Sequence, residues 1–212
     1  MLTKTLERLL PRRAGSKPVD HAITYFDHVR LPATSILGSI LKPDNMRENF
    51  LSTIWRVGVG SLSLSTTCVP CLEISAYIAA KYSLRRKVAA PDGNAVPIIH
   101  FRTQQKPILQ TFALAAVMKA YAKEAPQWFM NQEYDPPVRH AFATAFKAVQ
   151  TQATQSYLFT LADRCGSQGL FDHNQIIELQ MEARGNSIAE GDVLALCIRT
   201  FIKEFHNRLA HK

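Results

Sequence analysis

Two short segments near the C-terminus carry the residue types in this sequence that are best suited to chemistry. The first, Cys165–Leu170 (Cys-Gly-Ser-Gln-Gly-Leu), is a glycine-rich turn. The second, Ser187–Asp192 (Ser-Ile-Ala-Glu-Gly-Asp), places Glu190 beside a glycine just before an apolar helical pattern. Glycine lets the backbone approach a ligand closely, and a carboxylate in apolar surroundings can act as a general base. Glu190 also has a purely structural interpretation, because an acidic residue at a helix start is stabilised by the helix dipole.

The composition is that of a globular protein with a basic surface. Apolar residues make up 47% of the 212 residues, charged residues make up 20%, and the net charge is +8. Such a charge suits anionic partners, including nucleic acid, acidic lipid and the phosphates of a nucleotide cofactor or coenzyme A. We find no nucleic-acid-binding motif and no uninterrupted apolar stretch of membrane-spanning length, so we predict neither type of partner.

The cysteines do not predict a metal site. Cys68-Val-Pro-Cys71 has the C-x-x-C spacing of redox and zinc sites, but the seven histidines are scattered and no strand-then-helix pattern surrounds the pair. We therefore interpret these cysteines as small, buried apolar residues on a helix.

Apolar periodicity predicts a mostly helical chain. Residues 1–43 form an N-terminal segment, and residues 44–212 form a helical domain. In the helix expected over 136–163, the apolar face contains Phe146, Val149 and Leu158. The predicted elements in chain order are a helix over 1–10, a strand over 21–31, a long helix over 44–84 capped by Asp44, a loop over 89–97, and helices over 101–123, 136–163, 174–183 and 192–210, with a possible further short piece over 125–134. The predicted fold is all-α, an up-down bundle of about four main helices with a short β-containing entry segment.

Four motifs in fixed order resemble the acyl-CoA oxidase and acyl-CoA dehydrogenase family. They are Phe26–Pro32 (Phe-Asp-His-Val-Arg-Leu-Pro), Tyr82–Lys87 (Tyr-Ser-Leu-Arg-Arg-Lys), Phe101–Gln105 (Phe-Arg-Thr-Gln-Gln), and the pair of C-terminal segments described above. The resemblance covers about residues 22–206. It implies the C-terminal helical domain of that family, preceded by the exit from its central β-domain.

The resemblance also implies roles for particular residues. Glu190 matches the glutamate that removes the α-proton of the substrate. Arg85, Arg86 and Gln105 match positions that bind the pyrophosphate and adenosine of FAD, partly across a dimer interface. Arginine suits this role because its planar guanidinium pairs with phosphate oxygens, although cations at a helix end also stabilise the helix dipole.

The glycine-rich turn departs from the family pattern. Gly166 and Gly169 match glycines that let FAD lie against the backbone. Ser167 replaces a further glycine, and Leu170 replaces a tyrosine. A helix C-cap followed by a turn is the alternative interpretation of this segment.

The sequence lacks counterparts of the N-terminal helical domain and most of the β-domain, which hold much of the flavin and acyl-CoA pockets in the family. Three functions are compatible with this pattern. The first is cofactor-free proton transfer, isomerisation or cyclisation of an apolar acyl or polyketide-like substrate, with Glu190 as general acid or base. The second is FAD-dependent acyl-CoA oxidation completed by a partner chain. The third is a non-catalytic oligomerisation module. We favour the first, expect a homodimer, and leave an intracellular location, cytoplasmic or peroxisomal, open.

Overall fold

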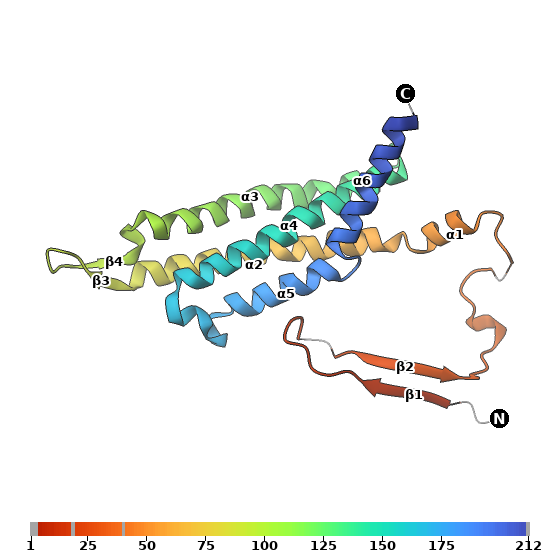
Figure 1. Ribbon diagram of the computed structural model, residues 1–212, viewed down its shortest axis with the longest axis horizontal. Coiled ribbons are helices and arrows are strands. Elements are labelled where there is room, and N and C mark those ends of the chain that lie inside the picture. The colour runs from red at the N-terminus through yellow and green to blue at the C-terminus, as the bar shows by residue number, and fades with distance from the viewer. Residues whose placement is uncertain (1–3, 18–19, 40, 211–212) are drawn as a thin grey trace. The chain divides into compact units, whose positions relative to one another are not determined.

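The chain divides into two compact units, Met1–Trp55 and Arg56–Lys212. The computed structural model describes residues 4–17, 20–39 and 41–210, with side chains as far as Phe201. Figure 1 shows the long helices of the second unit and the hairpin of the first.

The first unit contains a β-hairpin and a short helix. Strand β1 (Lys4–Leu9) pairs antiparallel with β2 (Ala22–Asp27) from Lys4 opposite Asp27 to Leu9 opposite Ala22. The predicted helix over 1–10 is therefore wrong over residues 4–9, and its first three residues lie outside the described chain. Cross-strand pairing with β2, a contact distant in sequence, outweighs the local helical preference here.

The predicted helix over 44–84 is interrupted near its start. Helix α1 (Met46–Thr53) ends at Ile54, and α2 (Arg56–Arg85) follows in the second unit. The cap is Asn45 rather than Asp44, because the Asn45 side chain accepts bonds from the backbone N–H groups of Arg47 and Glu48. In the last turn of α1, the hydroxyls of Ser52 and Thr53 both bond to the Asn49 carbonyl, a local arrangement that competes with helix continuation.

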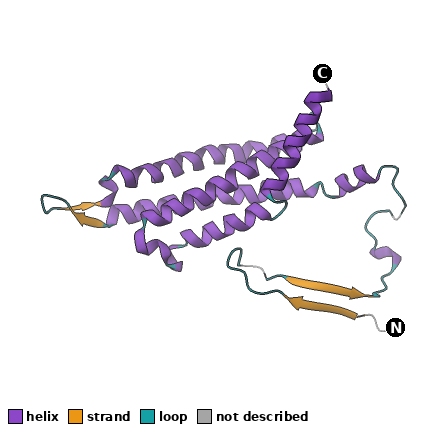
Figure 2. Ribbon diagram, viewed as in Figure 1, coloured by secondary structure: helices purple, strands orange, loops and turns teal. Residues whose placement is uncertain are grey.

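The second unit is a helical bundle with one small β-hairpin (Figure 2). It contains α2, β3 (Lys87–Ala89), β4 (Ala95–Pro97), α3 (Arg102–Met130), α4 (Pro136–Arg164), α5 (Ile176–Ile188) and α6 (Val193–Ala210), together with short 3₁₀ turns at Ile98–His100, Gly166–Leu170 and Asp172–Asn174. A further 3₁₀ turn, Ala33–Ser35, belongs to the first unit. The predicted all-α fold, an up-down bundle with a short β-containing N-terminal segment, is confirmed.

Local features of the second unit differ from the sequence-based prediction, and the helix expected over 174–183 extends to Ile188. The segment expected to be a loop over 89–97 contains the turn and strand β4 of the β3–β4 hairpin, in which Lys87 lies opposite Pro97. Helix α3 continues through Pro126 to Met130 instead of ending near residue 123. Ala125 and Phe129 are buried on either side of this proline, and their packing keeps the chain helical where local propensity opposes it.

The core lies between α2, α3, α4 and α5. Leu72, Ile108, Leu158 and Ile176 are buried together in one cluster. Small residues of α2, including Ala76 and Ala79, join this cluster and allow the neighbouring helices to approach closely. The stretch Met46–Arg85 is long and apolar enough to cross a membrane by length and composition alone, a test that core helices of soluble proteins also pass.

Candidate functional site

Glu190 lies in the short loop that joins α5 to α6. It is half-buried, and its backbone has a left-handed conformation with φ = 54°, followed by Gly191 with φ = 97°. A non-glycine residue in this region carries backbone strain. The surrounding contacts must therefore hold this loop in place.

The Glu190 side chain lies directly against a glycine of α2. A Cβ atom placed on Gly60 would be only 2.5 Å from Cδ and 2.8 Å from Oε2 of Glu190. These distances are shorter than van der Waals contact, so any side chain at residue 60 would displace the carboxylate. The missing side chain of Gly60 thus creates the space that the carboxyl group of Glu190 occupies.

Two side chains from neighbouring helices bind the backbone of this loop. The Ser61 hydroxyl on α2 donates to the Glu190 carbonyl at 3.0 Å. The Lys147 ammonium on α4 donates to the carbonyls of Ala189 and Gly191, on either side of Glu190. All three carbonyls of residues 189–191 therefore accept a side-chain hydrogen bond.

Lys147 is fully buried, with 0% of its surface exposed. Burial lowers the pKa of its ammonium, while the negative charges of Glu190 and Asp192 act in the opposite direction. Removing an ammonium from water costs several kcal/mol unless hydrogen bonds and charges compensate. The sequence analysis missed this residue. A single lysine within an amphipathic helix is usually exposed, so the sequence does not indicate that Lys147 is buried.

Asp192 is the N-cap of α6, as the sequence indicated. Its Oδ1 accepts from the backbone N–H groups of Leu194 at 2.9 Å and Ala195 at 3.2 Å. The two acidic residues of the motif therefore differ in role. Asp192 closes the helix start, while Glu190 extends away from it onto α2.

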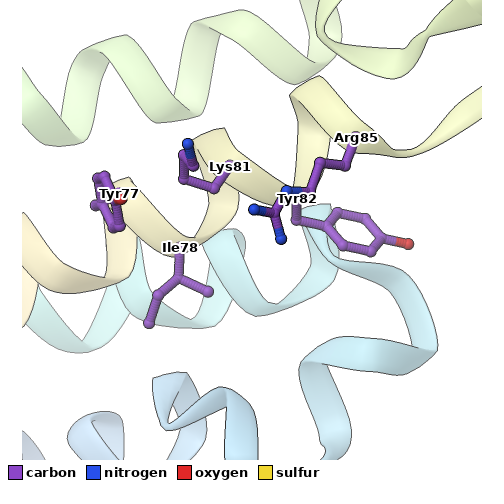
Figure 3. Close-up of a pocket in the computed structure, with 5 residues that line it drawn as sticks. All are labelled: Tyr77, Ile78, Lys81, Tyr82 and Arg85. Atoms are coloured by element: carbon purple, nitrogen blue, oxygen red, sulfur yellow. The ribbon is translucent and has the colours of Figure 1, made fainter.

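Arg85 contributes to a separate cavity of about 340 Å³ on the surface of α2 (Figure 3). The other lining residues are Tyr77, Ile78, Lys81 and Tyr82. The Lys81 ammonium lies 6.0 Å from the centre of the Tyr77 ring. Two cations and two aromatic rings on one helix face suit a ligand with an anionic group and a flat ring.

The other predicted FAD residues near this end of α2 are arranged differently. Arg86 is exposed, and its backbone N–H bonds to the Tyr82 carbonyl. Gln105 is half-buried at the start of α3. The buried neighbour Gln104 donates to the Ser83 hydroxyl at 2.8 Å and to the Arg164 carbonyl at 2.6 Å. Gln104 therefore fastens the ends of α2 and α4 to the start of α3.

The two glycines of the C-terminal turn have different surroundings. Gly166 has φ = 59° and open space where a Cβ would lie, and it lines a cavity of about 600 Å³ with Phe159, Arg164 and other residues of α4 and α5. A Cβ on Gly169 would lie 2.2 Å from the Ala162 carbonyl. Gly169 is therefore required for packing on α4, and of the two glycines only Gly166 is open to a ligand.

The predicted site residues form two groups rather than one. Arg85, Arg86, Gln105 and Gly166 lie near the end of the bundle fastened by Gln104, whereas Glu190 lies on Gly60 near the start of α2. The 25 residues from Gly60 to Arg85 correspond to about 37 Å along a helix. Of the positions predicted to bind FAD, Arg85 lines a cavity and Gly166 borders open space, whereas Gly169 packs against Ala162.

Cys68 is buried as expected, whereas Cys71 is only half-buried. Cys68 is buried, and burial raises the pKa of its thiol; burial also raises the pKa of Cys165 to about 11. Thiols with such pKa values are unreactive at neutral pH. Over the part of the chain that the structure describes, no cluster of three His, Cys, Asp or Glu residues could hold a metal ion.

Known proteins resemble this chain in sequence and in fold. Human peroxisomal acyl-coenzyme A oxidase 3 is 21% identical over 210 residues, which cover 85% of this chain and 29% of that protein. Acyl-CoA oxidase-1 of Caenorhabditis elegans, solved in complex with FAD and ATP, superimposes with a TM-score of 0.78 at 21% identity and covers 92% of this chain and 31% of that one. Butyryl-CoA dehydrogenase of Megasphaera elsdenii gives a TM-score of 0.76 at 15% identity, covering 95% and 49%.

These similarities concern one part of the larger proteins, since the chain spans less than a third of the length of the human relative. Residues 60–202 match the family described as acyl-CoA oxidase, C-alpha1 domain. This match includes Gly60, Lys147 and Glu190, as well as the Arg85 cavity. The chain therefore belongs to the acyl-CoA oxidase family, and its helical bundle is the C-alpha1 domain of that family.

Proposed function

We propose that this bundle transfers a proton at a carbon atom next to a carbonyl group of an apolar acyl or polyketide-like substrate, with Glu190 as the general acid or base. The observation that supports this proposal is the placement of Glu190. Its carboxylate lies half-buried in the space left by Gly60, and its loop is bound by side chains of two helices. A positioned carboxylate of this kind accelerates proton transfer by about 10²- to 10⁴-fold.

The reaction needs no redox cofactor. The Cα–H bond of the substrate breaks, the proton moves to a carboxylate oxygen of Glu190, and the electron pair forms an enolate. Return of the proton to a different carbon atom completes an isomerisation. Attack of the enolate on a second carbonyl of the same molecule completes a cyclisation, in which Glu190 gives its proton to the new alkoxide.

Exchange of the substrate α-proton in D₂O tests this proposal directly. With butyryl-CoA and palmitoyl-CoA as probes, we expect deuterium to appear at the α-carbon, as measured by mass spectrometry. Glu190→Gln should lower the rate by about 10²-fold or more, because an amide cannot accept the proton. Glu178→Gln on the exposed face of α5 is the matched control and should leave the rate unchanged. Equal rates for wild type and Glu190→Gln would remove Glu190 from the mechanism.

FAD-dependent acyl-CoA oxidation is the second candidate, and the Arg85 cavity and the open turn at Gly166 favour it. Arg85, Arg86 and Gln105 would bind the phosphates and adenosine, Gly166 would admit the cofactor to the backbone, and bound FAD would supply a hydride acceptor. In this candidate function a partner chain or a second copy completes the site. Titration of FAD against the protein, followed by flavin fluorescence, tests it.

We expect Arg85→Ala to weaken FAD binding by about tenfold if this second function is correct, since one charge-assisted pair with phosphate is lost. Lys119→Ala, which removes a cation from an exposed ion pair with Glu73 on the same bundle, is the control. Absence of FAD binding together with absence of α-proton exchange would leave a non-catalytic oligomerisation module. For the location, the name of the human relative favours the peroxisome over the cytoplasm.

A further inference from the structure

Lys147 is a charged residue buried inside the helical bundle. Its side chain is fully buried on α4. Neither of the two ion pairs found among the described residues includes it. A buried ammonium needs partners for its N–H groups, and Lys147 donates to two backbone carbonyls of a single loop, those of Ala189 and Gly191.

These two carbonyls flank Glu190, whose own carbonyl is bound by Ser61. The loop is strained at this point, because Glu190 has a φ of 54°. This backbone conformation turns the side chain of Glu190 toward α2 and onto Gly60. Lys147 therefore binds the loop on both sides of Glu190.

Charge couples the same groups. Three titratable groups act on Lys147: Glu190 and Asp192 from the α5–α6 loop, and Cys68 from α2. Burial lowers the pKa of Lys147, and Glu190 is the strongest of the three groups that oppose this effect. The charge of Glu190 thus favours the ammonium form of Lys147, although the two groups form no direct ion pair among the described residues.

We propose that Lys147 is a positioning residue for the Glu190 carboxylate, holding the 189–191 loop so that the acid stays over Gly60. This inference rests on the proposed role of Glu190 in proton transfer. Lys147 itself has no surface exposed to solvent. Its effect reaches the reaction through the loop conformation and the charge.

The experiment compares Lys147→Met with wild type, with Lys119→Met as the control at an exposed lysine. Hydrogen–deuterium exchange of peptides covering residues 186–195 should be about tenfold faster or more in Lys147→Met, because two hydrogen bonds to the loop are lost. Exchange of α3 peptides should not change. Lys119→Met should match wild type in the loop.

A second measurement separates positioning from general structural support. NMR titration of the Lys147 side chain should show a lower pKa in Glu190→Gln than in wild type, since the opposing charge is removed. In the α-proton exchange assay with butyryl-CoA, Lys147→Met should lower kcat by about 10- to 100-fold with a smaller change in KM, as expected for a misplaced group.

The outcomes distinguish this inference from the proposed function. If Glu190→Gln exchanges α-protons as fast as wild type, the proposed function fails, while loop exchange and the Lys147 titration still test the coupling without a substrate. Unchanged loop exchange in Lys147→Met, or an unchanged Lys147 pKa in Glu190→Gln, overturns the positioning role. If Lys147→Met does not fold, the Lys147 titration in Glu190→Gln decides alone.

Discussion

A substitution at Gly60 can test the position of the Glu190 carboxylate separately from the stability of the protein. Gly60→Ala would bring a Cβ to 2.5 Å from the Cδ of Glu190. Only a flexible side-chain end has to move, while alanine favours the helix over glycine by about 1 kcal/mol. We expect Gly60→Ala to be as stable as wild type or slightly more stable in urea denaturation, yet to lose α-proton exchange.

Ser63→Ala, on an exposed position of the same helix, controls for helix propensity in this comparison. It should raise helix stability slightly, because alanine is the better helix former, and leave exchange at the wild-type value. A Gly60→Ala variant with full exchange activity would show that the carboxylate does not act from the position seen here.

Lys147 predicts a specific dependence of stability on pH. Burial holds the pKa of Lys147 below its usual 10.5 in the folded state. Between the lowered pKa and about 10.4, the unfolded chain binds a proton that the folded chain has released, so the free energy of unfolding rises with pH. The stability of wild type relative to Lys147→Met should therefore increase from pH 7 to pH 10.

Urea denaturation of both proteins at several pH values measures this difference, and comparison with Lys147→Met cancels the opposing titration of the buried thiols. Lys119→Met should show no comparable trend, because Lys119 is exposed. A constant or falling difference would contradict the burial of a charged Lys147.

At the residue scale, the sequence pointed to Glu190 but not to the residues that contact it. Glu190 stood out because a motif surrounds it, and Asp192 because caps have a local signature. Lys147 and Gly60 are recognisable only when α2, α4 and the loop are packed together. The same limit explains Val149, which was expected on the buried face of α4 and is 52% exposed, while Lys147 two residues earlier is buried.

At the scale of the helices, the cap of α6 is the contact most open to a direct test. Asp192→Ala removes the acceptor for two backbone N–H groups and should cost about 1 kcal/mol of unfolding free energy. Asp192→Asn should retain most of the stability, since asparagine caps as well as aspartate. Urea denaturation at pH 7 measures both, and equal losses would contradict the capping role.

The predicted helices agree with the structure where local signals agree with packing. Helix α4 begins at Pro136 after Asp135, and α6 begins after its cap, as their sequences indicate. The errors fall where distant contacts decide. Lys4–Leu9 is a strand because β2 pairs with it, and the β3–β4 hairpin depends on pairing across a turn.

At the scale of the whole molecule, we expect a homodimer. Leu109 and Val117 on α3 are each 64% exposed, and contiguous exposed apolar side chains are characteristic of association surfaces. Size-exclusion chromatography with light scattering should give about twice the 23.8 kDa of the chain. A mass of one chain at all concentrations tested would contradict this expectation.

The distance along α2 between its two ends has a consequence for genetics and engineering. Substitutions farther apart than about 10 Å, with no shared partners, change free energies additively. The free-energy effects of substitutions around Arg85 and around Glu190 should therefore add. Substitutions that line the Arg85 cavity should leave the contact between Glu190 and Gly60 unchanged.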